Sequence, residues 1–191
     1  DERGAMPRKA RLDIPGVLQH IMARGIEKGI IYRDHQDREA FLERLSDVIT
    51  EAEANLYAWV LMPNHFHLLL RPRVASMADI MRRLLTGYSV WHNKRHQRKG
   101  HLFQNRYKSI LVEEDAYFLE LVRYIHLNPV RGKIVAEPDQ LDTNPYTGHG
   151  VILGKCWYDC QDVDGVLRWF GNWVGPARKQ YRAFVMAGFH Q

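Results

Sequence analysis

Two histidines separated by one residue, His65 and His67, are the first candidates for metal chemistry in this sequence. They interrupt an apolar run, Met62–Leu70. If the run is a strand, side chains alternate between its two faces, so both imidazoles point to one side while Phe66 and Leu68 point to the other. Neutral imidazoles are common metal ligands. The run therefore predicts a strand with a metal-binding face and a core face, although two ordinary hydrogen-bonded histidines would give the same pattern.

A second group of chemical side chains, Tyr124 and Asn128, closes a helical pattern that begins near Asp115. Residues four apart share one face of a helix, so a phenol and a carboxamide oxygen are offered to the same partner. His126 falls on the opposite face, because a helix turns by about 100° per residue. A divalent ion held by imidazoles and an amide oxygen can bind a phosphate oxygen and polarise the phosphorus. The spacing alone thus predicts metal-assisted phosphoryl transfer.

Together, the His-Phe-His run and the Tyr-x-x-x-Asn helix resemble the single-tyrosine HUH transposases. Within that superfamily the chain is most similar to the REP-associated tyrosine transposases, relatives of insertion-sequence enzymes that act on single-stranded DNA. Further matching segments are Gln19–Gly25, Asp37–Leu42, Arg98–Tyr107 and Arg123–Arg131. The resemblance covers roughly residues 16 to 132.

This resemblance implies a role for each candidate residue. Tyr124 would be the covalent nucleophile, leaving a 5′-phosphotyrosyl DNA end and a free 3′-hydroxyl. His65, His67 and Asn128 would hold Mg²⁺ or Mn²⁺, and the substrate would be hairpin-associated single-stranded DNA. A tyrosine hydroxyl is a weak nucleophile at neutral pH, so the metal, the surroundings or the substrate must activate it. Tyr117, about two helical turns earlier, is the alternative nucleophile.

A basic stretch favours a polyanionic partner. The segment from Ile80 to Val112 contains no acidic residue and carries +8, whereas the whole chain carries +5 and the remainder therefore −3. Cations interleaved with rings are how proteins hold single strands without reading sequence. The residues that we expect to contact DNA are Arg24, Arg82, Arg83, Lys94, Arg95, Arg98, Lys99, His101, Phe103, Arg106, Tyr107 and Lys108.

The order of the predicted elements is typical of an α+β protein, with an antiparallel sheet and helices on its faces. The resemblance implies a ferredoxin-like or RRM-like sheet with the two histidines on a central strand. The tight turn at Pro63 predicts two antiparallel neighbours near the sheet centre. His20, on the first strand, is interpreted as a histidine beside the core rather than as a catalytic group. The predicted strands are Val17–Arg24, Leu56–Met62, His65–Arg71 and Ser109–Glu113.

The predicted helices follow from apolar spacing and from capping residues. Asp37 is expected to cap a helix that runs to Ala52, and Ser76 a helix that runs to Trp91. The helix that bears Tyr124 is expected to end at Pro129, because proline disfavours helical geometry in the residue before it. Past Gly132 the pattern weakens, and only short helices are predicted.

Length and composition indicate the domain organisation and the class of protein. The chain of 191 residues is 46% hydrophobic, which suits one core with an extension. We expect a cloning remnant at 1–5, a catalytic domain at 6–132 and a helical extension at 133–191 packed on it. No apolar run approaches the roughly 18 residues of a membrane helix, so a cytoplasmic protein, monomeric or homodimeric, is expected. The two cysteines, Cys156 and Cys160, are interpreted as reduced and structural.

Two other functions remain open from the sequence. One is a domesticated DNA-hairpin binder whose tyrosine no longer cleaves, which recovery of a covalent protein–DNA adduct would exclude. The other is a metallohydrolase of small molecules, which would leave the basic, aromatic segment unexplained.

Overall fold

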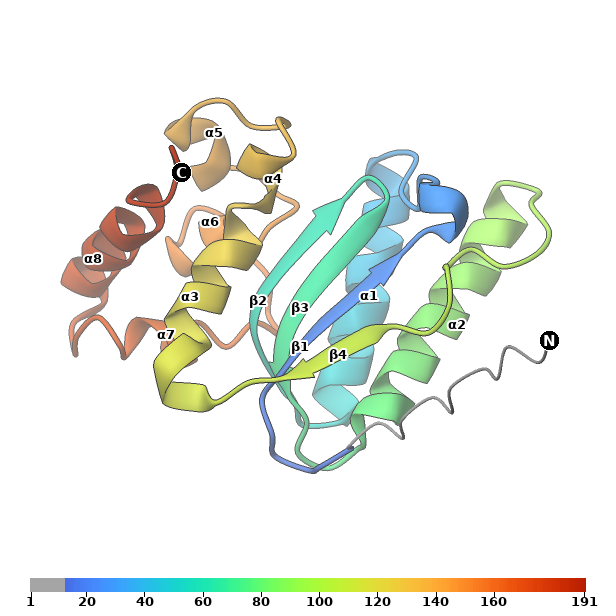
Figure 1. Ribbon diagram of the computed structural model, residues 1–191, viewed down its shortest axis with the longest axis horizontal. Coiled ribbons are helices and arrows are strands. Elements are labelled where there is room, and N and C mark those ends of the chain that lie inside the picture. Colours follow the sequence, from blue (N-terminus) through green and yellow to red (C-terminus); the bar gives the residue numbers. More distant parts are fainter. Residues whose placement is uncertain (1–12) are drawn as a thin grey trace, which may run out of the picture.

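The centre of the fold is a four-stranded antiparallel sheet in which the strands lie side by side in the order β2-β3-β1-β4 (Figure 1). The computed structural model describes residues 13–191, so the expected cloning remnant at 1–5 lies outside the described residues. The predicted α+β fold is confirmed, and β3, which carries the two histidines, lies inside the sheet. The strands are β1 (Gln19–Arg24), β2 (Asn55–Met62), β3 (His65–Arg71) and β4 (Lys108–Leu111).

Helices cover both faces of this sheet. The elements β1, α1, β2, β3, α2 and β4 follow one another in the order of a ferredoxin-like unit. Helices α1 and α2 pack on one face, and α3 packs on the other together with the helices that follow it (Figure 1). The helices are α1 (His35–Glu51), α2 (Met77–Arg95), α3 (Glu114–His126), α4 (Asn128–Arg131), α5 (Pro138–Asp142), α6 (His149–Ile152), α7 (Val163–Leu167) and α8 (Val174–Met186), with a short 3-10 helix, η1 (Ile26–Lys28). Among the described residues, no helix has the length and apolar character needed to cross a membrane.

Strand β3 contributes to two hydrophobic cores, one on each face. Phe66 and Leu68 lie in the core under α1 and α2, whereas Leu69 lies in the core that also contains Val122 of α3. This two-sided burial explains why the strand is apolar almost throughout. His65 and His67 belong to the α3 face, as the alternation of side chains predicted.

Strand β2 was expected near the sheet centre, and that expectation is wrong because β2 forms one edge. The side of β2 that does not pair with β3 is covered by the chain beyond Gly132. Isolated bridges join Val60 to Thr147 and Leu56 to Gln161, whose side chain accepts a hydrogen bond of 2.8 Å from Trp59 Nε1. The extension therefore closes an edge that would otherwise expose unpaired backbone groups.

Two helix boundaries also differ from the predictions. Asp34, not Asp37, caps α1 by accepting the N–H of Asp37, so Asp37 enters the first turn and is buried. Helix α3 ends at His126, and Pro129 does not stop the chain's helical course but sits in the first turn of α4. Proline is tolerated there because a first-turn N–H needs no helical partner.

Candidate active site

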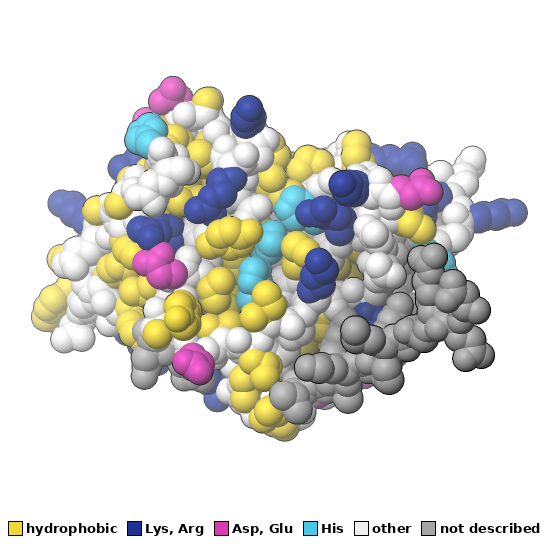
Figure 2. All heavy atoms as spheres, viewed as in Figure 1, with side chains coloured by type: hydrophobic (Ala, Val, Ile, Leu, Met, Phe, Trp, Pro, Cys, Tyr) yellow, Lys and Arg dark blue, Asp and Glu magenta, His cyan; other side chains and the backbone are white. Residues whose placement is uncertain are grey.

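The two histidines of β3 form the floor of the candidate site. Their ring centroids lie 5.2 Å apart; His67 is only 4% exposed and His65 is half-buried. On the neighbouring strand β1, Met22 stands opposite His67 and Arg24 stands opposite His65. Figure 2 shows histidine side chains at the centre of this face, with Lys and Arg side chains around them. The strand pairing thus places imidazoles next to a cation.

Hydrogen bonds at the Nδ1 atoms of both histidines determine which ring nitrogens stay available. Nδ1 of His65 lies 2.7 Å from Oδ1 of Asn64, and Nδ1 of His67 lies 2.9 Å from Nε2 of His20. Since an amide oxygen can only accept, His65 donates its Nδ1 proton and keeps a lone pair on Nε2. In the same tautomer, His67 carries its proton on Nδ1 and donates it to Nε2 of His20, and the Nε2 atom of His67 is free. This arrangement of an outer hydrogen bond behind each ligand is typical of metal-binding histidines.

Burial keeps these rings neutral. It lowers the pKa of His67 to about 3, with smaller contributions from the charges of His20, His65 and Arg24. Burial, followed by the charge of Arg24, also lowers the pKa of His65, and burial lowers the pKa of His20. A neutral imidazole has a lone pair to give, so the donor set fits a divalent ion at neutral pH.

Helix α3 places Tyr124 over this pair. The Tyr124 ring meets His67 and His20 edge to face, at centroid distances of 5.9 Å and 6.1 Å. Asn128 lies close enough to His65 to offset part of the lowering of the His65 pKa, and its Nδ2 lies 3.3 Å from the Tyr124 carbonyl oxygen. The structure therefore brings all four predicted chemical residues together. It also confirms that His126 faces away, because its Nδ1 bonds the Tyr181 hydroxyl at 2.7 Å.

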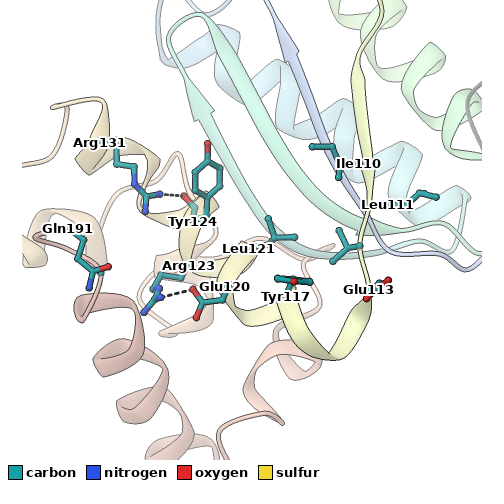
Figure 3. Close-up of a pocket in the computed structure, with 12 residues that line it drawn as sticks. Ile110, Leu111, Glu113, Tyr117, Glu120, Leu121, Arg123, Tyr124, Arg131 and Gln191 are labelled. Carbon is teal, nitrogen blue, oxygen red and sulfur yellow. Dashed lines mark hydrogen bonds and ion pairs between the residues drawn. The ribbon is translucent and has the colours of Figure 1, made fainter. Parts of the chain in front are cut away.

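Arg131 is a site residue that the sequence analysis missed. Its guanidinium carbon lies 4.8 Å from the centre of the Tyr124 ring, and its Nη1 donates to the Tyr124 carbonyl oxygen over 3.1 Å (Figure 3). The sequence signal for Arg131 is its position seven residues after Tyr124, about two helical turns. This spacing puts the two side chains on one face when α4 continues the course of α3. A fixed cation here can stabilise negative charge on the phenol oxygen or on a phosphate.

The last turn of α3 is held by a buried chain of hydrogen bonds to the extension. His149 Nε2 donates to Asp142 over 2.9 Å, so its Nδ1 accepts the Tyr181 hydroxyl, whose oxygen in turn accepts from Nδ1 of His126. Arg182 and Lys155 also donate to Asp142. Burial raises the pKa of Asp142, but these three donors outweigh burial and hold that pKa well below its usual range. The extension thereby fixes the helix that bears Tyr124.

Two cavities flank the candidate site. One, of about 740 Å³, lies between β4 and α3 and is lined by exposed apolar side chains, including Ile110 and Tyr117, next to Tyr124 (Figure 3). The other, of about 280 Å³, is lined by the cations Arg24, Lys28, Arg106 and Lys108. Within it, the buried Nε atom of Arg24 has no hydrogen-bond partner in the part of the chain that the structure describes. An anionic ligand would satisfy that donor.

Several residues expected to bind DNA lie elsewhere. Arg82 and Arg83 are on α2, on the opposite face of the sheet, and pair with Asp79 and Glu51 respectively. Arg95 pairs with Asp34 and with the buried Asp37. Arg83 and Arg95 thus join α2 to α1 and its capping residue, and Arg82 pairs within α2, so the placement of these three arginines does not support the predicted DNA contact.

The expected stacking rings are also used internally. Phe103 packs on Phe66 and Tyr88 at centroid distances of 6.2 Å and 6.4 Å, and Tyr107 is only 8% exposed. Both rings pack into the core under the loop after α2, Tyr107 as a buried and Phe103 as a partly buried residue, so their placement does not support the predicted stacking on DNA bases. Arg98 bonds the His101 carbonyl oxygen, while the side chains of Lys94, Lys99 and His101 are exposed.

Comparisons with known proteins agree with this geometry. Residues 16–128 match the protein family described as "Transposase IS200 like". No curated protein matches the chain. Among solved structures, the chain is similar to a REP-associated tyrosine transposase bound to a REP hairpin, with a TM-score of 0.62 and 16% identity over 83% of this chain and 90% of that one. A candidate transposase from Deinococcus radiodurans R1 is more distant, with a TM-score of 0.43 and 18% identity over 62% of this chain and 95% of that one.

Proposed function

The chain belongs to the IS200-like transposase family, and we propose that it cuts and rejoins single-stranded DNA beside hairpin elements through a covalent bond to Tyr124. The observation that carries the proposal is the position of the Tyr124 ring, 5.9 Å from that of His67, while Asn128 lies beside His65. A phenol, two neutral imidazoles and an amide, from β3 and from the adjoining ends of α3 and α4, thus lie together on one face of the sheet.

We infer that His65, His67 and Asn128 hold Mg²⁺ or Mn²⁺. When bound, such an ion would neutralise a nonbridging phosphate oxygen and make the phosphorus more electrophilic. The neutral amide of Asn128 leaves the site less anionic than a carboxylate would, which suits an anionic substrate. Arg131 lies close enough to the Tyr124 ring to stabilise charge that develops there.

The proposed step exchanges one ester for another. The phenol oxygen of Tyr124 forms a bond to phosphorus as the bond between phosphorus and the 3′ oxygen breaks. The phenol loses one proton and the departing 3′ oxygen gains one, so the overall proton count does not change. The phosphoester is retained as a 5′-phosphotyrosine, and attack by a 3′-hydroxyl reverses the step and joins strands.

The two cavities are suited to the strand on either side of the cut. Arg24, Arg106 and Lys108 can neutralise phosphates, and the groove between β4 and α3 can take bases from an unpaired strand. The REP hairpin of the similar solved complex suggests the substrate class, a single strand with a REP-like hairpin. DNA as substrate is consistent with the cytoplasmic location expected from the sequence.

The test is capture of the covalent intermediate. Single-stranded hairpin oligonucleotides labelled at the 3′ end are incubated with the protein and Mn²⁺, and the products are separated under denaturing conditions. The labelled fragment should migrate with the protein, and peptide mapping should place it on Tyr124. Tyr124→Phe should abolish the adduct while hairpin binding persists, because only the attacking oxygen is removed.

Tyr117→Phe is the matched control, since it removes a hydroxyl from the same helix and the same groove. It should leave adduct formation unchanged. An adduct on Tyr117 would overturn the assignment of the nucleophile. Tight hairpin binding without any adduct would instead identify a DNA-binding protein that no longer cleaves.

A further inference from the structure

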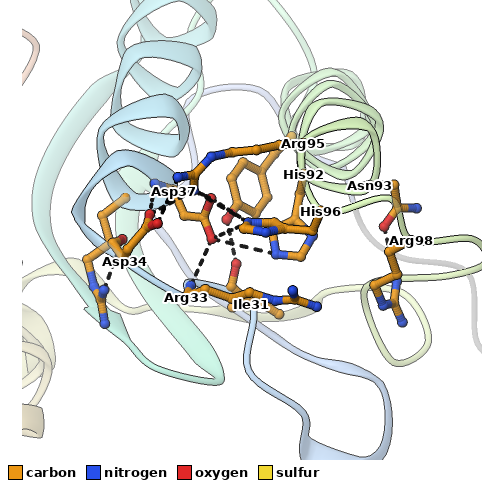
Figure 4. Close-up of polar contacts among 11 residues, drawn as sticks. Ile31, Arg33, Asp34, Asp37, His92, Asn93, Arg95, His96 and Arg98 are labelled. Carbon is orange, nitrogen blue, oxygen red and sulfur yellow. Dashed lines mark hydrogen bonds and ion pairs between the residues drawn. The ribbon is translucent and has the colours of Figure 1, made fainter.

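A second group of possible metal ligands lies on the opposite face of the sheet from Tyr124. It consists of Asp37, in the first turn of α1, and of His92 and His96, at the end of α2 (Figure 4). One ligand atom from each residue lies within 4.8 Å of the others. The histidines are four residues apart, so the helix presents both on one face. The two helices pack against each other, which brings the carboxylate to the imidazoles.

His92 is the residue in this group that ordinary hydrogen bonding does not explain. Its side chain is fully buried, and neither ring nitrogen has a hydrogen-bond partner among residues 13–191. Nε2 points at Oδ2 of Asp37 from 3.7 Å, too far for a hydrogen bond. Burial, as the main cause, lowers the pKa of His92 to about 4, so the ring is neutral and carries a lone pair. A buried lone pair aimed at a carboxylate is what a cation between them would satisfy.

Asp37 and His96 supply the other two donors. Burial raises the pKa of Asp37. Hydrogen bonds from the Arg33 N–H, His96 and Arg95 outweigh burial and hold that pKa below its usual value. The carboxylate is therefore ionised. Nε2 of His96 lies 2.9 Å from both carboxylate oxygens, so it also faces the centre of the group. The His96 side chain is 12% exposed, which leaves an approach for water as a further ligand.

Arginines around the group decide which ion it can hold. Arg95 pairs with Oδ1 of Asp37 and makes two further bonds of 2.8 Å to Asp34, while Arg33 and Arg98 act on His92 through their charges. This positive surrounding opposes any cation that is held by charge alone, such as Mg²⁺ or Ca²⁺. A borderline ion gains more from imidazole nitrogens, and Zn²⁺ is the common case. Because Arg95 is anchored on Asp34, it need not move for Oδ2 of Asp37 to bind such an ion.

We propose that Asp37, His92 and His96 form a Zn²⁺ site, separate from the candidate active site, that ties the start of α1 to the end of α2. The ion would fix the base of the loop that follows α2. That loop carries Gln104, Asn105 and Arg106, which line the basic cavity on the other side of the sheet. The site would therefore stabilise a substrate-binding loop from the opposite side of the sheet. This role of the loop rests on the proposed function, but the binding of Zn²⁺ does not depend on it.

The test counts Zn²⁺ sites in the metal-free full-length chain by calorimetric titration with Zn²⁺ alone. The reference is the His65→Ala/His67→Ala variant, in which the candidate active site has lost its imidazole ligands. This variant should still bind one equivalent of Zn²⁺, and Zn²⁺ should raise its melting temperature. Adding His96→Gln should abolish both effects, because glutamine can still donate to Asp37 but is a poor zinc ligand. His96 is chosen because it is at the edge of the group, and circular dichroism checks that the variant is folded.

His35→Gln is the matched control, since it removes an exposed histidine from the same end of α1 and should change neither effect. Co²⁺ gives a second readout, because bound in place of Zn²⁺ by two imidazoles and a carboxylate it should produce a visible absorption band that His96→Gln removes. The proposal is overturned if the reference variant binds no Zn²⁺, or if His96→Gln binds it as well as the reference does. In either case Asp37, His92 and His96 are only an ion-paired helix contact. Adduct formation on Tyr124 is measured separately, so either proposal can fail alone.

Discussion

Nε2 of His20 lies 2.9 Å from Nδ1 of His67, although the two residues are 47 positions apart in the chain. The contact crosses from β1 to β3, and the two rings are stacked with centroids 5.1 Å apart. We propose that His20 accepts the Nδ1 proton of His67, and so orients the His67 ring with Nε2 able to bind a metal. In this proposal His20 is a positioning residue, behind the proposed ligand.

Replacing His20 by phenylalanine should weaken metal use without abolishing it. The ring volume is nearly kept, but His67 loses the acceptor for its Nδ1 proton. Loss of such an outer hydrogen bond typically costs 10- to 100-fold in metal affinity, so the Mn²⁺ concentration for half-maximal adduct formation should rise by about that factor. His20→Gln, which restores an acceptor oxygen, should recover part of the affinity. An unchanged Mn²⁺ requirement in His20→Phe would show that the contact is only packing.

Asn128 should behave as a ligand and not merely as a helix-capping residue. We expect Asn128→Ala to require at least about tenfold more Mn²⁺ for adduct formation, or to lose it, because one donor to the ion is gone. Asn128→Asp should bind the metal more tightly, since a carboxylate is a stronger ligand, yet turn over more slowly with an anionic strand. The comparison is made by titrating Mn²⁺ at saturating hairpin DNA. Equal metal requirements for Asn128→Ala and the wild type would remove Asn128 from the ligand set.

The stability of the metal-free protein should fall as the pH drops below neutral. The folded state keeps His67 neutral until its pKa of about 3, and burial also lowers the pKa of His126 well below its usual value of 6.5. The unfolded chain takes up these protons near pH 6.5, so it binds more protons than the folded state below that pH. Stability from this source is complete above pH 6.5 and is lost as the pH falls towards the folded-state pKa values.

The expected size can be measured by urea unfolding in a chelating buffer. Each histidine that stays neutral when folded should cost about 2 kcal/mol between pH 7.5 and pH 5. His67→Gln should reduce that pH dependence by about the contribution of one histidine, even if its stability at pH 7.5 is also lower. A free energy of unfolding that does not change between pH 7.5 and pH 5 would contradict the burial of these neutral rings.

The sequence predicted the local parts of the site well. Alternation along β3 placed His65 and His67 together, and helical spacing placed Tyr124 with Asn128 and turned His126 away, because both rules depend only on neighbours in the chain. The contact between His20 and His67 could not be predicted in the same way. It depends on which residues face each other across two strands, and the sequence analysis fixed no such register.

Charge and aromatic content are less informative than spacing, for a different reason. Arg95 sits in the basic stretch but binds Asp34 and Asp37, which lie about sixty positions earlier. Phe103 and Tyr107 also fit a stacking pattern, yet the fold uses both to close the core after α2. Net charge counts residues without their partners, so it predicted a DNA-binding character but not which cations remain available for DNA.

Paired charge-removing variants should separate the cations that bind DNA from those that do not. Arg106→Gln/Lys108→Gln and Arg82→Gln/Arg83→Gln each remove two positive charges, so their effect on the net charge is the same. The first pair lines the basic cavity beside His65, whereas the second pair lies on α2 and is already paired with Asp79 and Glu51. Each phosphate contact to a single strand contributes about 0.7 to the slope of log affinity against log salt.

We therefore expect Arg106→Gln/Lys108→Gln to weaken binding of a single-stranded hairpin and to lower that slope by about 1.4, because two fewer counterion-releasing contacts form. Arg82→Gln/Arg83→Gln should leave the slope within about 0.3 of the wild type. The measurement is fluorescence anisotropy of a labelled hairpin at several salt concentrations, without added divalent metal so that cleavage does not interfere. If both pairs flatten the slope equally, the protein responds to DNA through its overall charge and the basic cavity has no special part in binding. If only the α2 pair does so, the strand runs over the face opposite Tyr124, and the proposed path of the substrate is wrong.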